Sequence, residues 1–519
     1  MRPVERAPNR RVWPVVRTSR NFQIFFPILI PSSCSGGTLQ RRARSASQCF
    51  RLPGGPMQTS PIHSDRARRR GRRGALVLFC STTLALLAGG VPPAVASHPG
   101  PWGFGLNDLG QVGDGTAIAP PPDPNDLNEI PPAHNPNPTT VVGSHTFKKV
   151  AAGGSHSLGL KNDDTVWAWG NNSSGQLGNG TTTASSTPVQ VTGLTGVTDI
   201  SAGDAHSVAV KGDRTVHAWG SNFSGQLGDG TTTDRSSPVQ VKGVGGIGVL
   251  EGVSKVAAGA YHTLALSSER RVYAWGGNDG GQLGNGTIID SSNPVVAGIT
   301  DVKKISAGSH SLAITEGSAL EPNDDPVYAW GPNNRGQLGF AADQDFHPVP
   351  TKVSGMPLGA TQVAAASSAG FSLALKQGEV WSWGANFAGQ LGHGDRFTGL
   401  NGPPSDPKQL CLCDPKPAKV RTSGTTTLAN VADIAAGYFH ALAIQRVNPT
   451  TTNVVAWGSN QYGQLGNGSS DPLGEGPEDC IDTNCSWFAK TVLDSSTSST
   501  PLANVRSIAG GSNHSLAAA

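Results

Sequence analysis

Residues 167–180 read WAWGNNSSGQLGNG, and close copies of this stretch recur along the 519-residue chain. Alignment on the Gly-Gln pair finds seven copies, 50 to 74 residues apart, each with an aromatic residue seven positions before the glutamine. These aromatic residues are Phe104, Trp169, Trp219, Trp275, Trp330, Trp383 and Trp457. Recurrence at such intervals is typical of a propeller or another closed repeat array.

A second motif, of the form AGxxHSL, alternates with the first and also occurs seven times. Its histidines are His156, His206, His262, His310, His440 and His514, and the fifth copy has Phe371 in their place. The first tryptophan-type copy has no histidine motif before it, and the last histidine motif has no tryptophan motif after it. We therefore predict an all-β, seven-bladed β-propeller of four-stranded antiparallel blades. Its ring would be closed by pairing the N-terminal strand around Phe104 with the C-terminal strand around Ser515.

Each repeat is expected to hold four short strands, in keeping with 68 glycines, 38 prolines and only 14% charged residues in the chain. In the second complete repeat the predicted strands are residues 199–202, 207–211, 215–219 and 238–242. Gly170 and Asn172 are residue types that turns require, and Asn179-Gly180 suits a tight turn. The tryptophans are expected to pack blade against blade.

The N-terminal region has the three parts of a secretory signal. Residues 66–73 (RARRRGRR) are basic, residues 75–91 are apolar, and Ala94-Val95-Ala96 is a small-residue cleavage site. We therefore predict a signal peptide over 57–96, cleavage after Ala96, and a secreted or cell-surface protein. A transmembrane anchor is the alternative, because the apolar run is close to the shortest bilayer span.

The distribution of charge separates this N-terminal region from the rest of the chain. Residues 1–96 carry sixteen arginines against Glu5 and Asp65, whereas the whole chain has a net charge of only +3, so the remainder is acidic. An acidic body disfavours nucleic acid as a partner, because binding phosphates needs clustered lysine and arginine. Residues 1–56 are predicted to be a disordered leader or upstream translation, and no membrane span is expected after cleavage.

Four cysteines follow the predicted cleavage site: Cys411, Cys413, Cys480 and Cys485. An even number in an exported chain favours disulfides, and three connectivities could join them. A zinc site is the alternative, but neither CLC nor CIDTNC has the two-residue gap of common zinc ribbons.

The recurring histidines are predicted to be structural. A catalytic group is needed once per active centre, whereas a residue that ties strands together is needed once per blade. Asn179, Asn285 and Asn484 fit the glycosylation triplet, but the GNGT turns lack the alternating acids of a calcium loop. No catalytic residue, metal ligand or cofactor is therefore predicted.

The alternation of AGxxHSLAL with AWGxNxxGQLGxG resembles the regulator of chromosome condensation (RCC) repeat, whose family fold is a seven-bladed propeller. The resemblance covers about residues 101–519 and departs from the pattern at Phe104, at Phe371 and in several insertions. The propeller domain is accordingly placed at 97–519. Its insertions are expected at 119–138, 315–326, 395–427 and 469–499.

Function is expected in these unrepeated segments. The resemblance implies nucleotide exchange on a small GTPase with chromatin binding, but the exchange residues cannot be matched, and the acidic body and export signal argue against both. Plant photoreceptor members use a tryptophan motif for which this chain has GGSHS or GDAHS. An exported bacterial member instead binds a β-lactamase through loops on one face.

We therefore expect an exported, non-catalytic and monomeric interaction module that binds a protein or cell-surface partner. The alternatives are a guanine-nucleotide exchange factor and an enzyme acting on wall polysaccharide. For such an enzyme, Asp395, Asp406 and Asp414 are the nearest carboxylate cluster.

Overall fold

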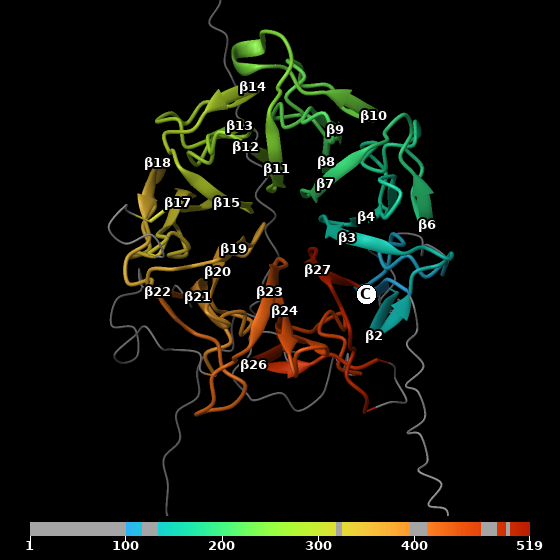
Figure 1. The fold of residues 1–519 in the computed structure, drawn as a ribbon, viewed down its shortest axis with the longest axis vertical. Coiled ribbons are helices and arrows are strands. Elements are labelled where there is room, and N and C mark those ends of the chain that lie inside the picture. The colour runs from blue at the N-terminus through green and yellow to red at the C-terminus, as the bar shows by residue number, and fades with distance from the viewer. Residues whose placement is uncertain (1–99, 117–132, 318–323, 395–412, 469–484, 495–498) are drawn as a thin grey trace, which may run out of the picture. The chain divides into compact units, whose positions relative to one another are not determined.

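The computed structural model describes residues 100–116, 133–317, 324–394, 413–468, 485–494 and 499–519. These residues form 28 strands and one short 3-10 helix, Val244–Gly246, arranged as seven four-stranded antiparallel sheets (Figure 1). The all-β, seven-bladed prediction is confirmed. None of the helices in the described ranges has the length and hydropathy needed to cross a membrane.

We number the blades 1 to 7 and list each from its innermost strand outward. Blade 1 is β3 (Phe147–Ala152), β4 (His156–Lys161), β5 (Val166–Gly170) and β6 (Ser185–Gln190). Blade 2 is β7 (Val197–Ala202), β8 (His206–Lys211), β9 (Val216–Gly220) and β10 (Arg235–Gln240). Blade 3 is β11 (Val253–Ala258), β12 (His262–Ser267), β13 (Val272–Gly276) and β14 (Ser291–Val296). Blade 4 is β15 (Val302–Ala307), β16 (Ser311–Thr315), β17 (Val327–Pro332) and β18 (Phe346–Lys352).

Blade 5 is β19 (Gln362–Ala365), β20 (Phe371–Lys376), β21 (Glu379–Ala385) and β22 (Cys413–Lys419). Blade 6 is β23 (Val431–Ala436), β24 (His440–Arg446), β25 (Thr452–Ser459) and β26 (Cys485–Thr491). Blade 7 combines both ends of the sequence: β27 (Ser507–Gly510), β28 (His514–Ala518), β1 (Trp102–Leu106) and β2 (His134–Thr140). The first strand of every blade lies near the ring axis and the fourth lies at the rim (Figure 1).

Pairing of β1 with β28 closes the ring, as the split repeat predicts. The two strands are antiparallel, with Trp102 opposite Ala517 and Phe104 opposite Ser515. A propeller closed in this way leaves no blade incomplete.

Three outer strands lie within ranges that the sequence analysis treats as insertions: β2 overlaps 119–138, β22 lies in 395–427 and β26 lies in 469–499. An outer strand pairs on one side only, so it tolerates proline and shows no strict apolar alternation. The strands HNPNPTT and CDPKPAK show this character, which explains why periodicity did not reveal them.

The core lies between blades, and each repeat tryptophan is fully buried there. Trp219 of blade 2 shares one apolar cluster with Leu158 and Leu160 of blade 1. Trp275 of blade 3 packs in the same way with Val208 and Val210 of blade 2. Burial of these large rings between neighbouring sheets supplies much of the apolar area that holds the blades together.

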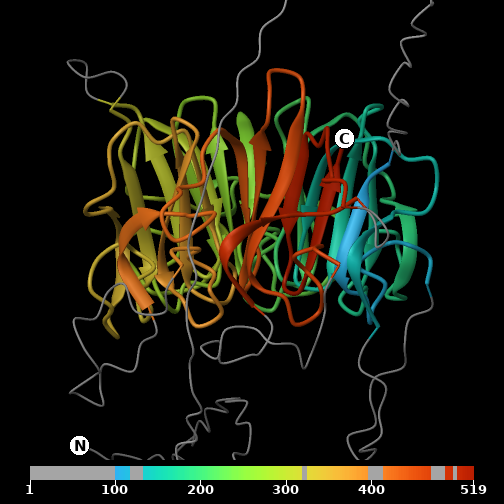
Figure 2. The ribbon, with the colours of Figure 1, turned by 90° about the horizontal axis from the view of Figure 1, so that it is seen from below.

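The two faces of the ring carry different connections. Strands alternate in direction within a blade, so first-to-second turns and third-to-fourth loops lie at one end, which we call the Gln-loop face. Second-to-third turns and the connections between blades lie at the other end, the opposite face. The strands run between these two faces, and β28 ends at the opposite face, where Figure 2 marks the C-terminus.

Candidate functional site

The repeated histidines connect neighbouring blades. Each Nε2 lies within hydrogen-bond distance of a hydroxyl in the next blade, and the rings are essentially fully buried. The pairs are His156–Ser207 at 2.9 Å, His206–Thr263 at 3.0 Å, His262–Ser311 at 2.8 Å, His310–Ser372 at 2.6 Å, His440–Ser515 at 2.9 Å and His514–Ser157 at 3.0 Å.

The same hydroxyls also bond to the loops between third and fourth strands, which carry the repeated Gly-Gln pair and which we call the Gly-Gln loops. Ser207 Oγ donates to the main-chain oxygen of Gln176 at 2.9 Å, and Trp219 Nε1 donates to that oxygen at 2.9 Å. Because the single hydroxyl proton goes to the carbonyl, Ser207 Oγ must accept from His156, which makes Nε2 the protonated ring nitrogen. Burial lowers the pKa of His156 and His262 to about 3, so these rings stay neutral and inaccessible to solvent.

Two boundaries depart from this pattern. In blade 5, Phe371 replaces the histidine, and Ala441 of blade 6 replaces the hydroxyl that a histidine would meet; both are fully buried in one apolar cluster. In blade 7, Phe104 has no N–H group, and the main-chain oxygen of Gln464 accepts from Ser515 Oγ at 2.8 Å. At the Phe371 boundary the polar pair is therefore exchanged for an apolar pair.

The polar residues of the Gly-Gln loops bond within their own loops. Asn172 Oδ1 accepts from Leu177 N at 2.9 Å, and Asn172 Nδ2 donates to the main-chain oxygens of Thr181 and Thr183 at 3.0 and 2.9 Å. Gly170 has φ of +102°, and a Cβ there would lie 2.6 Å from the Ser155 oxygen. This conformation requires glycine, so the repeated loop is built from turn chemistry.

The glycosylation triplets fall partly within the described chain. Asn179 Oδ1 accepts from Thr181 N at 3.1 Å, and Asn285 Oδ1 accepts from Thr287 N at 3.1 Å. Both side chains therefore stabilise turns. Asn484 lies outside the described residues.

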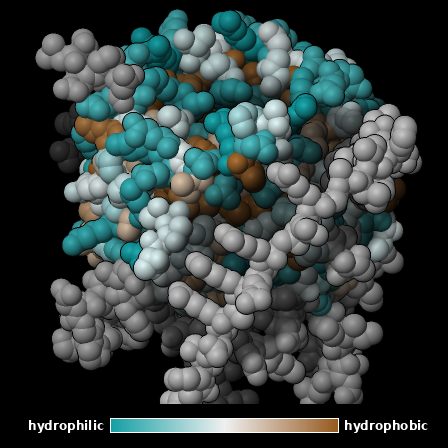
Figure 3. Space-filling model, turned by 60° about the horizontal axis from the view of Figure 1, so that its bottom comes forward, coloured by the Kyte–Doolittle hydropathy of each residue, from teal (hydrophilic) through white to brown (hydrophobic). Residues whose placement is uncertain are grey.

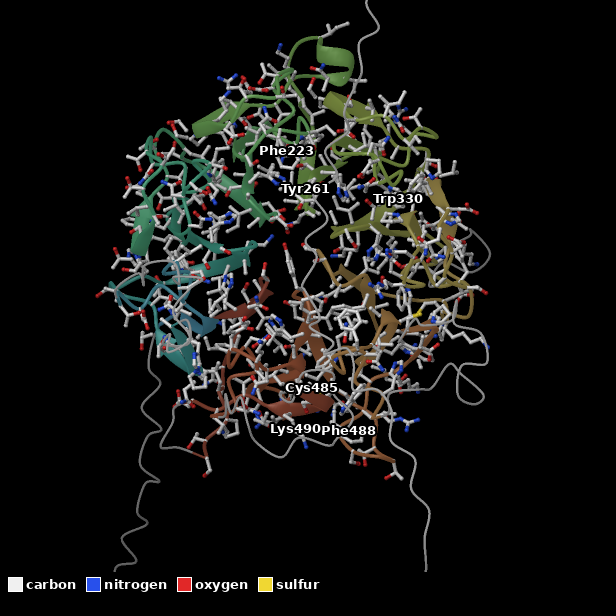
Figure 4. All side chains as sticks on the ribbon, turned by 180° about the vertical axis from the view of Figure 1, so that it is seen from behind. Phe223, Tyr261, Trp330, Cys485, Phe488 and Lys490 are labelled. Atoms are coloured by element: carbon white, nitrogen blue, oxygen red, sulfur yellow. The ribbon has the colours of Figure 1, made fainter. Side chains whose placement is uncertain are left out.

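Other candidates from the sequence are only partly described. Cys413 begins the outer strand β22 and Cys485 begins the outer strand β26, where Figure 4 labels Cys485. Cys411 and Cys480 lie outside the described residues. The cysteine pairing stays a prediction. Asp414 is 5% exposed and its Oδ1 accepts from Lys416 N at 3.0 Å, while Asp395 and Asp406 lie outside the described ranges. Within those ranges no group of three or more His, Cys, Asp or Glu could hold a metal ion.

A pocket of about 390 Å³ opens on the Gln-loop face near the ring axis. It spans blades 2 to 5, and its lining includes Asp204, Tyr261, Asp279, Pro332, Phe346 and Ser368. First-to-second turns supply Asp204, Tyr261 and Ser368, and third-to-fourth connections supply Asp279. Pro332 ends β17 and Phe346 begins β18, so these two border the same type of connection. The described lining residues therefore come from four repeats, and none of them lies in the predicted insertions 119–138, 315–326, 395–427 and 469–499.

Asp204 is the distinctive polar group of this pocket. Its Oδ1 is buried and has no hydrogen-bond partner in the described part of the ring. Burial raises the pKa of Asp204 to about 6, although a hydrogen bond with the Tyr438 side chain of blade 6 opposes this shift. Burial and the Asp204 charge in turn raise the pKa of Tyr438. Asp204 is therefore a carboxylate whose charge is poorly compensated within the protein.

Exposed aromatic side chains border the pocket. Phe223 is 61% exposed and Tyr261 is 47% exposed, and their rings meet edge to face with centroids 5.3 Å apart. Figure 4, which looks onto the Gln-loop face, shows the two side by side. The repeat position equivalent to Phe223 is Ser173 in blade 1 and Asp279 in blade 3, so the scaffold does not require an aromatic residue there. On the wall of the ring, which Figure 3 shows, apolar residues are instead dispersed among hydrophilic ones.

Charge also separates the two faces. The described connections of the Gln-loop face carry Asp108, Asp114, Asp204, Asp229, Asp234, Asp279, Asp290, Asp343 and Asp345, against the basic residue Arg335. Second-to-third turns on the opposite face mix both signs, as in Lys161 with Asp163 and Lys211 with Asp213. The Gln-loop face therefore combines negative charge with exposed aromatic rings.

Comparisons with known proteins agree with this architecture. A family model described as the RCC1-like domain matches residues 76–397, and one described as the regulator of chromosome condensation (RCC1) repeat matches residues 377–444. The Ultraviolet-B receptor UVR8 of Arabidopsis thaliana is 30% identical over 326 residues, which are 62% of this chain and 54% of the receptor.

The probable E3 ubiquitin-protein ligase HERC6 of Homo sapiens is 32% identical over 44% of this chain and 20% of its own length. The chain thus spans about half, or less, of these relatives. The crystal structure of Prp20p from Saccharomyces cerevisiae has a TM-score of 0.60 at 20% identity, covering 80% of this chain and 90% of that one, which shows a common fold.

Proposed function

Since the chain belongs to the RCC1-like domain family, we propose that its ring is an exported, non-catalytic scaffold that binds a protein or cell-surface partner through the Gln-loop face. Scaffolds of this fold include Prp20p, which has binding properties to Gsp1p and histones. The repeated histidines, hydroxyls and tryptophans of this chain already bond to each other between blades. We therefore assign partner binding to residues that vary between the repeats.

The observation that carries this proposal is the exposed aromatic pair Phe223 and Tyr261 beside the pocket. Exposed aromatic rings on a rigid surface are common anchors of protein interfaces, because they bury a large area at little entropic cost. Their placement on one face, on loops held by the scaffold, favours one binding surface over several dispersed ones.

The test compares proteins captured from culture by the mature chain and by two variants. The double variant Phe223→Ser/Tyr261→Ser removes the aromatic pair. Its control is Ile247→Ser, which changes an 83% exposed apolar residue on the opposite face. We expect a protein that is retained by wild type and the control and lost with the double variant. Equal retention by all three chains would exclude the aromatic pair as the anchor.

Export is supported by the basic, apolar and small-residue pattern over residues 66–96. N-terminal sequencing of protein from the medium should begin at Ser97. A mature start before Ser81 would contradict export by this signal. Two disulfides among the four cysteines would raise the intact mass by four daltons on reduction, and an unchanged mass would exclude them.

Nucleotide exchange on a small GTPase is the competing function. The fold is shared with Prp20p, but at 20% identity that likeness extends to the fold alone. A nucleotide-release assay with small GTPases distinguishes the two: we expect no acceleration by the mature chain. Acceleration by catalytic amounts would replace the proposal.

A further inference from the structure

We propose that the pocket on the Gln-loop face receives one cationic side chain, lysine or arginine, from the protein partner. This inference rests on the proposed function and adds the chemistry of the residue that the ring selects. Three features of the described pocket lining support it: acidic residues, exposed aromatic side chains, and no lysine or arginine.

Two acidic residues, Asp204 and Asp279, line the pocket. Asp204 Oδ1 is buried and has no hydrogen-bond partner in the described residues. Asp279 lines the same pocket and accepts from Gln282 Nε2 at 3.0 Å. None of the described lining residues is lysine or arginine. A buried carboxylate without a cation is unfavourable, so a ligand that brings one gains both Coulomb energy and a hydrogen bond.

The aromatic lining is suited to the rest of a long basic side chain. Tyr261 and Phe346 border the pocket and are 47% and 53% exposed. Their rings can cover the methylene stem and attract the cationic head through the π face. Burial raises the pKa of Tyr261, and the charges of Asp204 and Asp279 raise it further.

A metal ion suits this pocket less well than an organic cation. Divalent ions need several protein oxygens or nitrogens around one point, and the described residues contain no cluster of three His, Cys, Asp or Glu. The nearest imidazole, His262, already bonds to Ser311 at 2.8 Å. An organic cation needs only one or two carboxylates and an apolar wall, which this pocket has.

The direct test titrates the mature chain with three blocked tripeptides, Ac-Gly-Arg-Gly-NH2, its lysine analogue and its citrulline analogue. Citrulline keeps the shape of arginine and removes the charge. We expect saturable binding of the arginine and lysine peptides at millimolar concentrations, and binding of the citrulline peptide at least about tenfold weaker. Equal affinity for arginine and citrulline, or no saturation by arginine, would overturn the inference.

Asp204→Asn supplies the matched variant, because it removes the charge and keeps the size. We expect it to lose the preference for arginine over citrulline. Asp213→Asn, in a second-to-third turn of the opposite face, should retain that preference. Thermal melts of both variants verify folding. If Asp204→Asn folds and still prefers arginine, the carboxylate is not the receptor of the cation.

The capture experiment separates this inference from the proposed function. A partner that is lost with Phe223→Ser/Tyr261→Ser but retained by Asp204→Asn would leave the binding face in place and overturn the cation pocket. Retention by both variants would overturn both proposals.

Discussion

Phe371 of blade 5 and Ala441 of blade 6 lie in one buried apolar cluster, at the boundary where a histidine and a hydroxyl would otherwise meet. A histidine opposite Ala441 would leave its buried Nε2–H group without a bond, which costs about 1–3 kcal/mol. The two departures from the repeat therefore compensate each other. They show that the histidine serves the joint between blades rather than any chemistry of its own.

Phe371→His alone should destabilise the ring by about 1–3 kcal/mol, because its Nε2 would face the methyl group of Ala441. Ala441→Ser alone should be nearly neutral, since its hydroxyl can donate to the main-chain oxygen of Gln390, which accepts from Trp457 Nε1 at 2.9 Å. The double variant should recover most of the loss. Urea unfolding of the four chains gives the coupling energy, and simple additivity of the single changes would contradict the pairing.

His262→Ala should lower the free energy of unfolding by about 2 kcal/mol, because it removes the bond to Ser311 and leaves a cavity in a fully buried joint. Thr232→Ala, at an exposed loop position, is the control and should be neutral. Thermal melts and partner capture are measured together. An unchanged melt with lost capture would assign the histidine to binding instead.

Stability should fall as the pH drops below about 6.5. Burial lowers the pKa of five repeat histidines to about 3 and that of His514 to about 4. Unfolding exposes them, and they then take up protons, so each contributes up to about 1.4 kcal/mol per pH unit in this window. Asp204, with a pKa raised to about 6, opposes the trend by one proton. Urea midpoints between about pH 4.5 and pH 7 measure the slope, and a flat midpoint would contradict burial of the neutral rings.

Gly220→Ala should destabilise by at least about 2 kcal/mol, because Gly220 has φ of +100° and an added Cβ would lie 2.6 Å from the Ala205 oxygen. Gly212→Ala is the matched control, since its Cβ would be 3.6 Å from the nearest atom. The control should change stability by less than about 0.5 kcal/mol. Similar urea midpoints for the two variants would rule out the strained turn.

Affinity for the arginine peptide should fall as the pH drops through about 6, where Asp204 becomes protonated. The other titratable groups near this carboxylate are Tyr438, Tyr261, Asp279 and His262, and His262 stays neutral because burial lowers its pKa to about 3. Titrations at about pH 5 and about pH 7 measure the change. Asp204→Asn should remove it, and pH-independent binding by wild type would contradict the assignment.

The repeat predicted the scaffold closely because its signals are local. The alternating Val208 and Val210, together with Trp219, predicted strands at 207–211 and 215–219. These bounds agree within one residue with those of β8 and β9. The pairing of Phe104 with Ser515 followed from counting incomplete repeats. The outer strands β2, β22 and β26 escaped detection, because a strand with one free edge accepts proline and irregular polarity.

The candidate site could not be predicted from such local signals. Function in the insertions stays a prediction, whereas the pocket gathers residues of four repeats that the sequence did not single out. Aromatic residues at positions where other repeats have serine or aspartate, such as Phe223, were the available signal. Only the closed ring shows that Asp204 Oδ1 has no partner and that the Tyr438 side chain of blade 6 hydrogen-bonds to the Asp204 side chain.

The binding face is tested most directly by a photo-crosslinking residue placed at one position of each face. Position 261, where Tyr261 is 47% exposed, lies on the Gln-loop face, and position 447, where Val447 is 58% exposed, lies on the opposite face. The mature chain is irradiated in culture and its adducts are resolved by mass. We predict a discrete protein adduct from position 261 and none from position 447. An adduct from position 447 without one from position 261 would contradict binding through the Gln-loop face.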